Sequence, residues 1–440
     1  MARELASWGR FPYCPQEKHA CSWMSELPAL LQRLAQHSNG TLPYGNGRSY
    51  GDSCLAYSGE LLQTRQLDRM ISADWETGLV RMEAGVTLAE LLAVAIPRGW
   101  FLPVTPGTKF VTLGGAVAND VHGKNHHVRG TFGRHLQRFA LVRSDQQTTL
   151  ICSATENTDL FRASIGGLGL TGVIAWVELQ LMPITSSRID GITVRFDSLS
   201  EFFNLSEEFD RTHEYTVAWI DCLARGSSAG RGIFSVGNHA QGGKLQVDER
   251  ARLRVPITPP ITLMNRVSLN LFNTAYFNLH KAGRHASQRS YDPFFYPLDS
   301  ILHWNRIYGR KGLQQYQCVI PEAAADSAMS EILASIAASG SGSFLAVMKR
   351  CGDVQSPGLM SFPMPGVSLA LDFPQHSGLE SGLFHRLDAI VRGAEGRLYP
   401  AKDAHMAGDD FRSFYPAWEQ VEKLRDPALL SHFWKRVIQA

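Results

Sequence analysis

The amino-acid sequence predicts a protein of two domains that mixes helices and strands. Its 440 residues are more than one hydrophobic core normally serves. Most of the glycine-rich turns lie in the first 185 residues, and from Ile189 onward the apolar residues follow alternating or helical spacings with fewer such turns. This change of pattern marks the expected domain boundary.

Composition narrows the class of protein. With a formal net charge of +2, the chain lacks the single-sign field that attracts nucleic acid, so we expect no nucleic-acid partner. The stretch "MARELASWGRFPYCPQ" has no uninterrupted apolar segment, and no stretch reaches the roughly 20 apolar residues of a spanning helix. Seven cysteines without a C-x-x-C pair argue against a disulfide framework and a zinc ribbon. We therefore expect a cytoplasmic protein with reduced thiols.

The first domain carries clear helix and strand signals. "SELPALLQRLAQHS" has helical spacing. "LVRMEAGVTLAELLAVAIPRGW" predicts a strand, a turn at Gly85, and an amphipathic helix that Thr87 caps and that Pro97 and Gly99 end. "RFALVRSD" and "TTLICSA" then predict two short strands joined as a hairpin.

A later stretch contains a misleading motif. "NTDLFRASIGGLGLTGVIAWVELQL" predicts a capped helix, a glycine turn and a strand, and Gly167, Gly169 and Gly172 fit the G-x-G-x-x-G pattern of a dinucleotide-binding fold. That pattern needs a strand before the glycines and a helix after them, and here the order is reversed. We expect these glycines to let the backbone approach a ligand or a neighbouring strand.

The stretch "LPYGNGRSYGDS" (42–53) is a candidate anion-binding loop. Three glycines in seven residues, with Asn, Ser and Asp between them, suit a nest of inward-pointing N–H groups. Plain turns have the same composition, so this motif alone leaves both interpretations open.

The stretch "VTLGGAVANDVHGKNHH" (111–127) raises the question of a metal. His122 and His126 are four residues apart, as ligands on one helix face would be, but the glycines make a helix here unexpected. Lys124 would also repel a divalent cation. We expect no metal, and we expect the small residues to pack against a large planar ligand.

Four separated motifs, in order, resemble the vanillyl-alcohol-oxidase-type FAD oxidoreductases. They are "GNGRSYGD", "TPGTKFVTLGGAVANDVHGKNHH", "GGLGLTGVI" and "LYPAKD", and "NRIYGRKGLQQYQCVIP" extends the likeness through the middle of the chain. Within this family the likeness is to the branch that oxidises a polyprenyl-phosphoryl ribose. The resemblance implies an α+β protein with a PCMH-type FAD-binding fold. It divides the chain into an FAD domain (1–185), a substrate domain on a large antiparallel sheet (186–395), and a C-terminal return to the FAD domain (396–440).

The resemblance also implies where FAD binds. The pyrophosphate is expected on the loop 43–53, because backbone N–H groups in glycine turns can neutralise phosphates without bulky side chains. The implied cofactor residues are Pro43, Tyr44, Gly45, Asn46, Gly47, Arg48, Ser49, Tyr50, Gly51, Asp52, Ser53, Gly107, Thr112, Leu113, Gly114, Gly115, Asn119, Asp120, Val121, His122, Ile174 and Tyr399.

The flavin is expected to bind without a covalent link. Relatives that tether the flavin use a histidine of the first loop, where this chain has Arg48, and a guanidinium cannot form that link. His122 in the second loop is the alternative attachment point.

Oxidation of an alcohol by a flavin needs a group that takes the hydroxyl proton and a group that offsets developing negative charge. The resemblance places Lys402 of "AKDAH" at the reacting centre, where it would bind substrate and offset charge. Without the resemblance, Lys402 would be read as an exposed lysine on a polar turn. The other implied residues are His122, Gln317, Tyr50 and Lys124. His122 is either the base or a ring packed against the flavin, and both interpretations stay open.

Two stretches bear on the expected substrate pocket, and the first has the pattern of a strand. Along "LQQYQCVI", Gln315 and Gln317 share one face and Tyr316 takes the other. In "GVSLALDFP", Ser368 and Ala370 stand where the resembling proteins carry Asn and Cys, which alters the expected pocket wall.

The segment from Arg252 to Gly312 indicates the substrate class. It holds nine Lys or Arg residues against Asp292 and Asp299, interleaved with aromatic and aliphatic side chains. Cations beside apolar surface suit a polyprenyl phosphate, and contact with the inner face of a membrane uses the same features. A solvated basic face over an ordinary core is the alternative.

The resemblance therefore implies FAD-dependent oxidation of polyprenyl-phosphoryl-β-D-ribose at C2′ to the 2′-keto sugar. This reaction is the first half of an epimerisation to the arabinose form, in the service of cell-wall polysaccharide biosynthesis. A short-chain NAD(P)H reductase is the expected partner that completes it. The alternatives are a soluble aldonolactone or polyol oxidase, and a membrane-surface or glycan-binding protein that kept the flavin fold as a scaffold.

Overall fold

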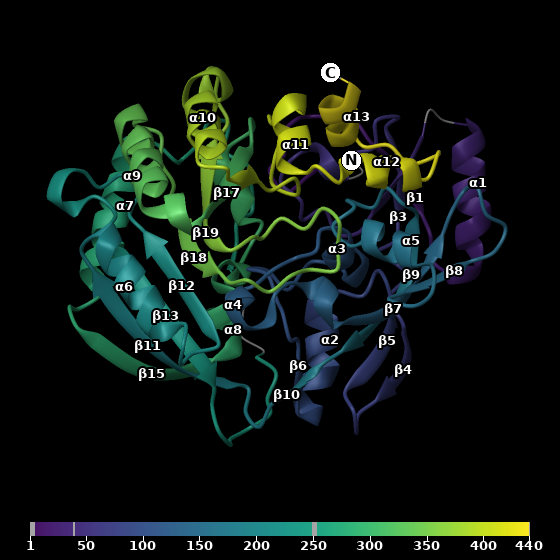
Figure 1. Cartoon of the computed structure of the whole chain (residues 1–440), viewed down its shortest axis with the longest axis horizontal. Helices are drawn as coiled ribbons and strands as arrows, with labels where there is room; N and C mark the ends of the chain where they lie inside the picture. The colour runs from purple at the N-terminus through teal and green to yellow at the C-terminus, as the bar shows by residue number, and fades with distance from the viewer. Residues whose placement is uncertain (1–4, 38–39, 249–252, 440) are drawn as a thin grey trace.

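Two large antiparallel sheets dominate the structure. The computed structural model describes residues 5–37, 40–248 and 253–439 of the chain. The larger sheet lies on the left of Figure 1 and the smaller on the right, and the C-terminal helices lie at the top of the view. The predicted α+β class, with a large antiparallel sheet, is confirmed.

The smaller sheet has five strands from the N-terminal part of the chain. They are β4 (Met70–Asp74), β5 (Leu79–Glu83), β7 (Leu136–Val142), β8 (Leu150–Ser153) and β9 (Val173–Gln180), in the order β4-β5-β9-β7-β8. β7 and β8 form the predicted hairpin. Helix α2 (Leu88–Ala95) begins at Thr87, whose hydroxyl accepts a hydrogen bond from the Glu90 N–H, as the sequence predicted.

A parallel sheet of three short strands carries the first glycine loop. Its order is β1 (Glu17–Ala20), β3 (Glu60–Gln63) and β2 (Leu42–Tyr44), and the predicted helix α1 (Leu27–His37) precedes β2. The loop follows β2 directly, so this sheet fixes its position.

A helix occupies part of the second glycine loop, where none was expected. α3 (Leu113–Ala118) contains Gly114 and Gly115, and the Thr112 hydroxyl accepts a hydrogen bond from the Gly115 N–H at 3.2 Å. The prediction was wrong because a cap and close packing outweigh the low helix propensity of glycine. A Cβ at Gly114 would lie only 3.0 Å from the Cβ of Ala84.

The capped helix predicted at Asn157 differs in one detail. α5 (Thr158–Ser164) and β9 flank the glycine turn in the predicted order. The Asn157 side chain does not cap α5, because it donates instead to the carbonyl oxygen of Ile151 at 2.7 Å.

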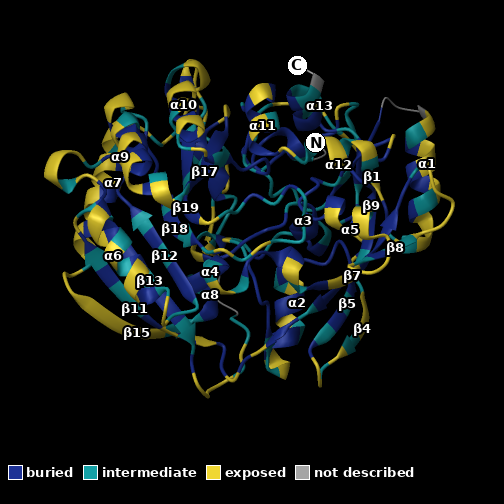
Figure 2. Cartoon of the chain, in the orientation of Figure 1, coloured by how far each residue is buried: buried dark blue, intermediate teal, exposed yellow. Residues whose placement is uncertain are grey.

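The larger sheet has eight strands, all antiparallel. They are β11 (Arg188–Phe196), β12 (Tyr215–Ile220), β13 (Gly232–His239), β15 (Arg284–Ser290), β17 (Leu313–Pro321), β18 (Ala346–Cys351), β19 (Gly366–Pro374) and β20 (Arg397–Leu398). Their order is β15-β11-β13-β12-β18-β19-β17-β20. Helices α6 (Leu199–Phe209), α9 (Glu322–Ser339) and α10 (His385–Gly393) pack on one face and form the main core with it (Figure 2). The opposite face is left for the site.

Shorter elements complete the structure. The strand pairs are β6 (Trp100–Phe101) with β10 (Met182–Pro183), and β14 (Leu253–Arg254) with β16 (Ile301–Leu302). The remaining helices are α4 (His126–Arg129), α7 (Arg266–Leu279), α8 (Tyr291–Phe295), α11 (Gly408–Phe414), α12 (Trp418–Leu424) and α13 (His432–Gln439). The last strand of the smaller sheet, β9, ends at Gln180, and the first strand of the larger sheet, β11, begins at Arg188. The predicted domain division at residue 185 falls between them and stays a prediction.

Candidate active site

A cavity of about 590 Å³ combines both parts of the chain. The glycine loops form one side of its wall. Side chains from β12, β13, β17, β18 and β19, together with Phe272 and Tyr276 of α7, form the other. The uncovered face of the eight-stranded sheet therefore looks into this cavity.

The first glycine loop can bring its backbone to the cavity because it carries few side chains. A Cβ at Gly45 would lie 2.3 Å from the Thr112 hydroxyl oxygen, and one at Gly47 would lie 2.0 Å from the Tyr44 hydroxyl oxygen. Gly47 also has a φ of +58°, in the left-handed region. Glycine is therefore required at both positions by space, and at Gly47 by backbone conformation as well.

The glycine turn at residues 167–172, between α5 and β9, also reaches the cavity. Gly169 and Gly172 line it, and both have positive φ angles, +75° and +152°. A Cβ at Gly172 would lie 2.7 Å from the Leu141 side chain on β7. This turn thus approaches both a neighbouring strand and the cavity wall, the two roles considered from the sequence.

Most of the residues implied for FAD line the cavity, and four do not: Gly51, Asp52, Leu113 and Asp120. The space for a side chain at Gly51 is closed, since a Cβ there would lie 1.6 Å from the Asp403 carbonyl oxygen. Leu113 is buried in the core of the smaller sheet. These four residues therefore lie outside the cavity wall, and their contact with the cofactor stays a prediction.

Asp120 holds a loop instead of facing the cavity. Its carboxylate accepts hydrogen bonds from the hydroxyls of Ser356 and Ser361, both at 2.6 Å, and from the Gly133 N–H at 2.8 Å. The Asp120 carboxylate is thus hydrogen-bonded within the protein. Asp120 therefore ties the connection between β18 and β19 to the FAD-binding part of the chain.

The wall fits FAD. Three glycine turns present backbone to the cavity, as a dinucleotide with a pyrophosphate requires. Ile174 and the ring of Tyr399 add apolar wall suited to a planar ring system. Tyr399 is fixed from both sides, because its ring stacks on Phe362 at 4.6 Å and its hydroxyl donates to the Asn119 carbonyl oxygen at 2.8 Å.

Arg48 lies between aromatic rings at the cavity wall. Its guanidinium carbon is 4.1 Å from the centre of the Trp8 ring and 5.1 Å from that of Phe110. Burial lowers the pKa of Arg48, and the charge of Asp299 opposes this effect. Arg48 therefore supplies a cation at the position where a tethering histidine was considered.

All five residues implied for the chemistry, Lys402, His122, Gln317, Tyr50 and Lys124, line the cavity. The Lys402 side-chain nitrogen lies 3.9 Å from the centre of the Tyr50 ring. Burial lowers the pKa of Lys402 to about 8, although the nearby charge of Asp372 opposes this shift. Lys402 is thus a perturbed lysine inside a cavity and not an exposed one on a turn.

Asp372 is a functional candidate that the sequence analysis missed. Gln315 and Asp372 face each other in the register of β17 and β19, and the Gln315 amide donates to Asp372 Oδ1 at 2.5 Å. Burial raises the pKa of Asp372 to about 7, against the effects of this hydrogen bond and of Lys402. The sequence signal that could have identified Asp372 is an aspartate inside the otherwise apolar strand "SLALDF".

His122 is held by Gln317. Their Nε2 atoms lie 3.2 Å apart, and His122 Nδ1 has no hydrogen-bond partner among the described residues. Burial keeps the pKa of His122 well below 6.5, and the positive charge of Lys349 adds to this effect. The ring is therefore neutral at neutral pH.

Three cations, Lys124, Lys349 and Arg289, line the cavity without a carboxylate partner. The Lys124 ammonium donates to the carbonyl oxygen of Phe294, and the Lys349 ammonium donates to that of Gly123 at 2.6 Å. Arg289 lines the same cavity. Burial lowers the pKa of Lys124 to about 7 and that of Lys349 to about 8. Among the residues that the structure describes, no ion pair compensates any of the three.

The segment 252–312 contributes to the cavity wall. Arg289, Phe272, Tyr276 and Trp304 line the cavity, while Arg252 lies outside the described residues. Lys349, by contrast, comes from β18 and was missed, because one lysine in a short apolar strand gives no motif. Ser368 and Ala370, the departures noted in the sequence, both line the wall.

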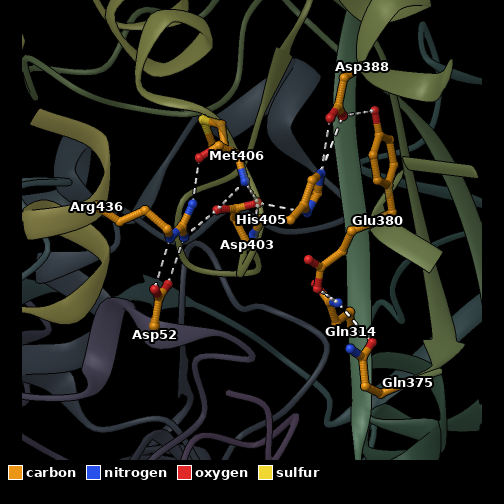
Figure 3. Close-up of polar contacts among 10 residues, drawn as sticks. Asp52, Gln314, Gln375, Glu380, Asp388, Asp403, His405, Met406 and Arg436 are labelled. Carbon is orange, nitrogen blue, oxygen red and sulfur yellow. Dashed lines mark hydrogen bonds and ion pairs between the residues drawn. The ribbon is translucent and has the colours of Figure 1, made fainter. Parts of the chain in front are cut away.

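A charged network includes Asp403, the residue that follows Lys402 in the chain (Figure 3). Arg436 of α13 binds Asp52 Oδ1 and Asp403 Oδ2, both at 2.9 Å. His405 lies between Asp403 at 3.1 Å and Asp388 at 3.3 Å. Asp52 therefore joins the first glycine loop to the C-terminal helix through Arg436, and its contact with FAD stays a prediction.

This network sets the protonation of its members. Two carboxylates raise the pKa of His405 to about 10 despite its burial. Arg436 and His405 hold the pKa of Asp403 well below its usual value, against burial. Because Asp403 follows Lys402 directly, the network fixes the backbone that carries Lys402.

The described residues show no metal-binding cluster of three His, Cys, Asp or Glu side chains. His122 and His126 do not share a helix, because α4 begins at His126 and His122 forms an isolated β-bridge with Thr131. Within the described ranges, no helix combines the length and apolar character needed to cross a membrane.

Comparisons with known proteins agree with this site. Residues 20–153 match the FAD binding domain family. The chain is 33% identical to decaprenylphosphoryl-β-D-ribose oxidase of Mycolicibacterium smegmatis, over 97% of this chain and 95% of that protein. It is 32% identical to an uncharacterized protein of Streptomyces coelicolor (77% and 95% covered), and 27% identical to L-gulonolactone oxidase of Mus musculus (41% and 40% covered). The chain belongs to the family of decaprenylphosphoryl-β-D-ribose oxidase, and it is an FAD-dependent oxidoreductase.

Proposed function

We propose that this protein oxidises polyprenyl-phosphoryl-β-D-ribose at C2′ to the 2′-keto sugar. The observation that carries this substrate class is the uncompensated positive charge of Lys124, Lys349 and Arg289 in the cavity. Buried charges without partners are costly, so a ligand that brings negative charge to them is stabilised. A phosphate brings that charge, and a neutral aldonolactone does not.

The apolar part of the wall suits the lipid part of this substrate. Trp219, Phe272, Tyr276 and Phe344 line the cavity beside the cations. Aromatic surface next to a cationic pocket is what a prenyl chain attached to a phosphate requires.

The reaction removes two electrons and two protons from the C2′ carbon and its hydroxyl, and FAD, when bound, is the two-electron acceptor. We assign proton acceptance to His122, because its ring is neutral and its basic form is therefore available. Lys402 in its protonated form offsets the negative charge that develops on the substrate oxygen. Gln317 positions His122 through the contact between their side chains.

The product of this reaction is a ketone, so a second enzyme must reduce it to complete an epimerisation to the arabinose form. A hydride from NAD(P)H on the opposite face of C2′ inverts that centre. A short-chain NAD(P)H reductase is therefore the partner that we propose.

The substrate assignment is tested by the absorption spectrum of the FAD-loaded protein without oxygen. A short-chain prenyl-phosphoryl-β-D-ribose should bleach the oxidised flavin, and L-gulono-1,4-lactone should leave it unchanged. Bleaching by the lactone alone would replace the lipid-linked pentose by the aldonolactone alternative.

We further propose that FAD is held without a covalent bond. Arg48 occupies the tethering position and packs on Trp8, and it cannot link to the flavin. Acid precipitation of the protein should leave all of the flavin in the supernatant. Flavin that stays with the precipitate would make His122 the attachment point, and His122→Ala would then release it.

A further inference from the structure

Helix α7 (Arg266–Leu279) has an apolar outer side. Leu269, Asn273 and Phe277 face the protein, at helical spacing, and are buried. On the other side Val267 and Leu271 are 77% and 71% exposed. Figure 2 shows α7 at the edge of the molecule with most of its ribbon coloured as exposed. Surface helices normally place polar residues on that side, so these positions call for a partner.

The chain that leads into α7 has the same character. Ile257 and Ile261 are both 73% exposed, and Leu263 is 52% exposed. This lead segment, residues 253–264, is held in place rather than loose. Arg306 donates to the carbonyl oxygens of Val255 and Pro256, at 2.9 and 2.7 Å.

A further strip of the same helix forms part of the cavity wall. Phe272 and Tyr276 line the cavity, and the Phe272 ring packs against Phe344 with centroids 5.7 Å apart. Phe272 directly follows the exposed Leu271, so the same turn of α7 carries both cavity wall and exposed apolar surface.

The charge around this surface has one sign. From Arg250 to Tyr291 the sequence contains no Asp or Glu. Five exposed cations lie on the lead segment, at the two ends of α7 and in the nearby turn that follows Gly309: Arg254, Arg266, Lys281, Arg310 and Lys311. Within the described part of the chain none of them forms an ion pair. Cations that flank exposed apolar side chains match the headgroups and acyl boundary of an anionic bilayer.

We propose that the outer side of α7, with residues 253–264, seats this protein on an anionic membrane surface. Val267, Leu271 and Ile261 enter the headgroup region, and the five cations contact lipid phosphates. The cavity then opens beside the bilayer, so a lipid-linked sugar can reach Lys402 while its prenyl tail remains in the membrane. The delivery of a lipid-linked sugar to Lys402 rests on the proposed function, whereas the binding of α7 to the membrane does not.

Vesicle flotation tests the seating with the full, FAD-loaded chain. The protein should float with phosphatidylcholine vesicles that contain about one third phosphatidylglycerol, and binding should weaken with salt. The double variant Val267→Glu and Leu271→Glu should bind about tenfold or more weakly, because two inserted side chains become charged. The matched control is Met70→Glu with Ile71→Glu. These residues are 42% and 40% exposed on β4, on the opposite side of Figure 1, and the control should float like the unchanged protein.

Two results would overturn the proposal. One is equal flotation of the α7 double variant and the control. The other is a wild-type protein that ignores vesicles but forms a dimer that the α7 variant loses, which would make this surface a protein interface. Flavin absorbance and circular dichroism of the variant show that it is folded.

The substrate question is kept separate by a soluble probe. A short-chain prenyl-phosphoryl-β-D-ribose should bleach the flavin of the α7 double variant as fast as that of the wild type. If neither protein is bleached while wild type still floats, the proposed function fails and the membrane seat stands. If the probe bleaches the flavin of both proteins but wild type and the α7 double variant float equally, the proposed function stands and the membrane seat fails.

Discussion

Lys349 donates its hydrogen bond to the carbonyl oxygen of Gly123 at 2.6 Å, in the same loop as His122. An ammonium buried against a neutral carbonyl keeps its full charge uncompensated, and its pKa falls to about 8 as a result of burial. This pair therefore joins β18 to the second glycine loop and also leaves a positive charge for a ligand.

Replacing Lys349 should weaken binding of a phosphorylated substrate. In Lys349→Met we expect KM for the prenyl-phosphoryl ribose to rise about tenfold or more, because a charge-assisted hydrogen bond contributes about 1.5–3 kcal/mol. Steady-state kinetics should show a much smaller effect on kcat. Lys423→Met, which removes an exposed lysine of α12, is the matched control. An unchanged KM in Lys349→Met would mean that no phosphate of the substrate binds beside Lys349.

Replacing Lys402 should abolish turnover but leave the cofactor in place. In Lys402→Met we expect kcat to fall by a factor of about 10² to 10³, the usual effect of removing one group that stabilises developing charge. Bound flavin, measured by absorbance at equal protein concentration, should match the wild type, because Lys402 does not belong to the glycine loops. Normal turnover in this variant would remove the role proposed for Lys402.

The pH dependence of turnover should report on Asp372. The rate should fall above about pH 8, where Lys402 loses its proton. Asp372 raises the pKa of Lys402, so Asp372→Asn should move this alkaline limb to lower pH. The profile of kcat/KM against pH checks this shift, with Asp409→Asn on exposed α11 as the control. A limb that stays in place would show that Asp372 does not act through Lys402.

How far the sequence predicted this site depends on the kind of signal. The glycine loops and Lys402 lie in contiguous motifs, so the resemblance located them. Asp372 and Lys349 lie alone in short apolar strands. Only the pairing of β17, β18 and β19 places Lys349 in the cavity wall and Asp372 opposite Gln315. The ion pair of Asp52 with Arg436 was equally out of reach of the sequence, because the two residues lie at opposite ends of the chain.

The helical part of the fold shows the same limit. Thr87 caps α2 through its own neighbour Glu90, so local sequence was sufficient there. The helix at Gly114 depends on contact with Ala84 of another segment, and a propensity argument confined to neighbouring residues misses it.

The network of Figure 3 makes a prediction about stability and pH. The pKa of His405 is raised from 6.5 to about 10 in the folded state, so its protonation stabilises the fold fully below about pH 6.5 and this contribution is lost as the pH rises through 10. His405→Gln should therefore lower the free energy of unfolding by about 3–5 kcal/mol at pH 6, because it leaves Asp403 and Asp388 without their buried partner. The difference from wild type should shrink steadily toward pH 10. Urea unfolding at pH 6, 8 and 10 measures it, with His376→Gln, at an exposed position, as the control. A difference that stays constant over this range would show that His405 is neutral in the folded protein.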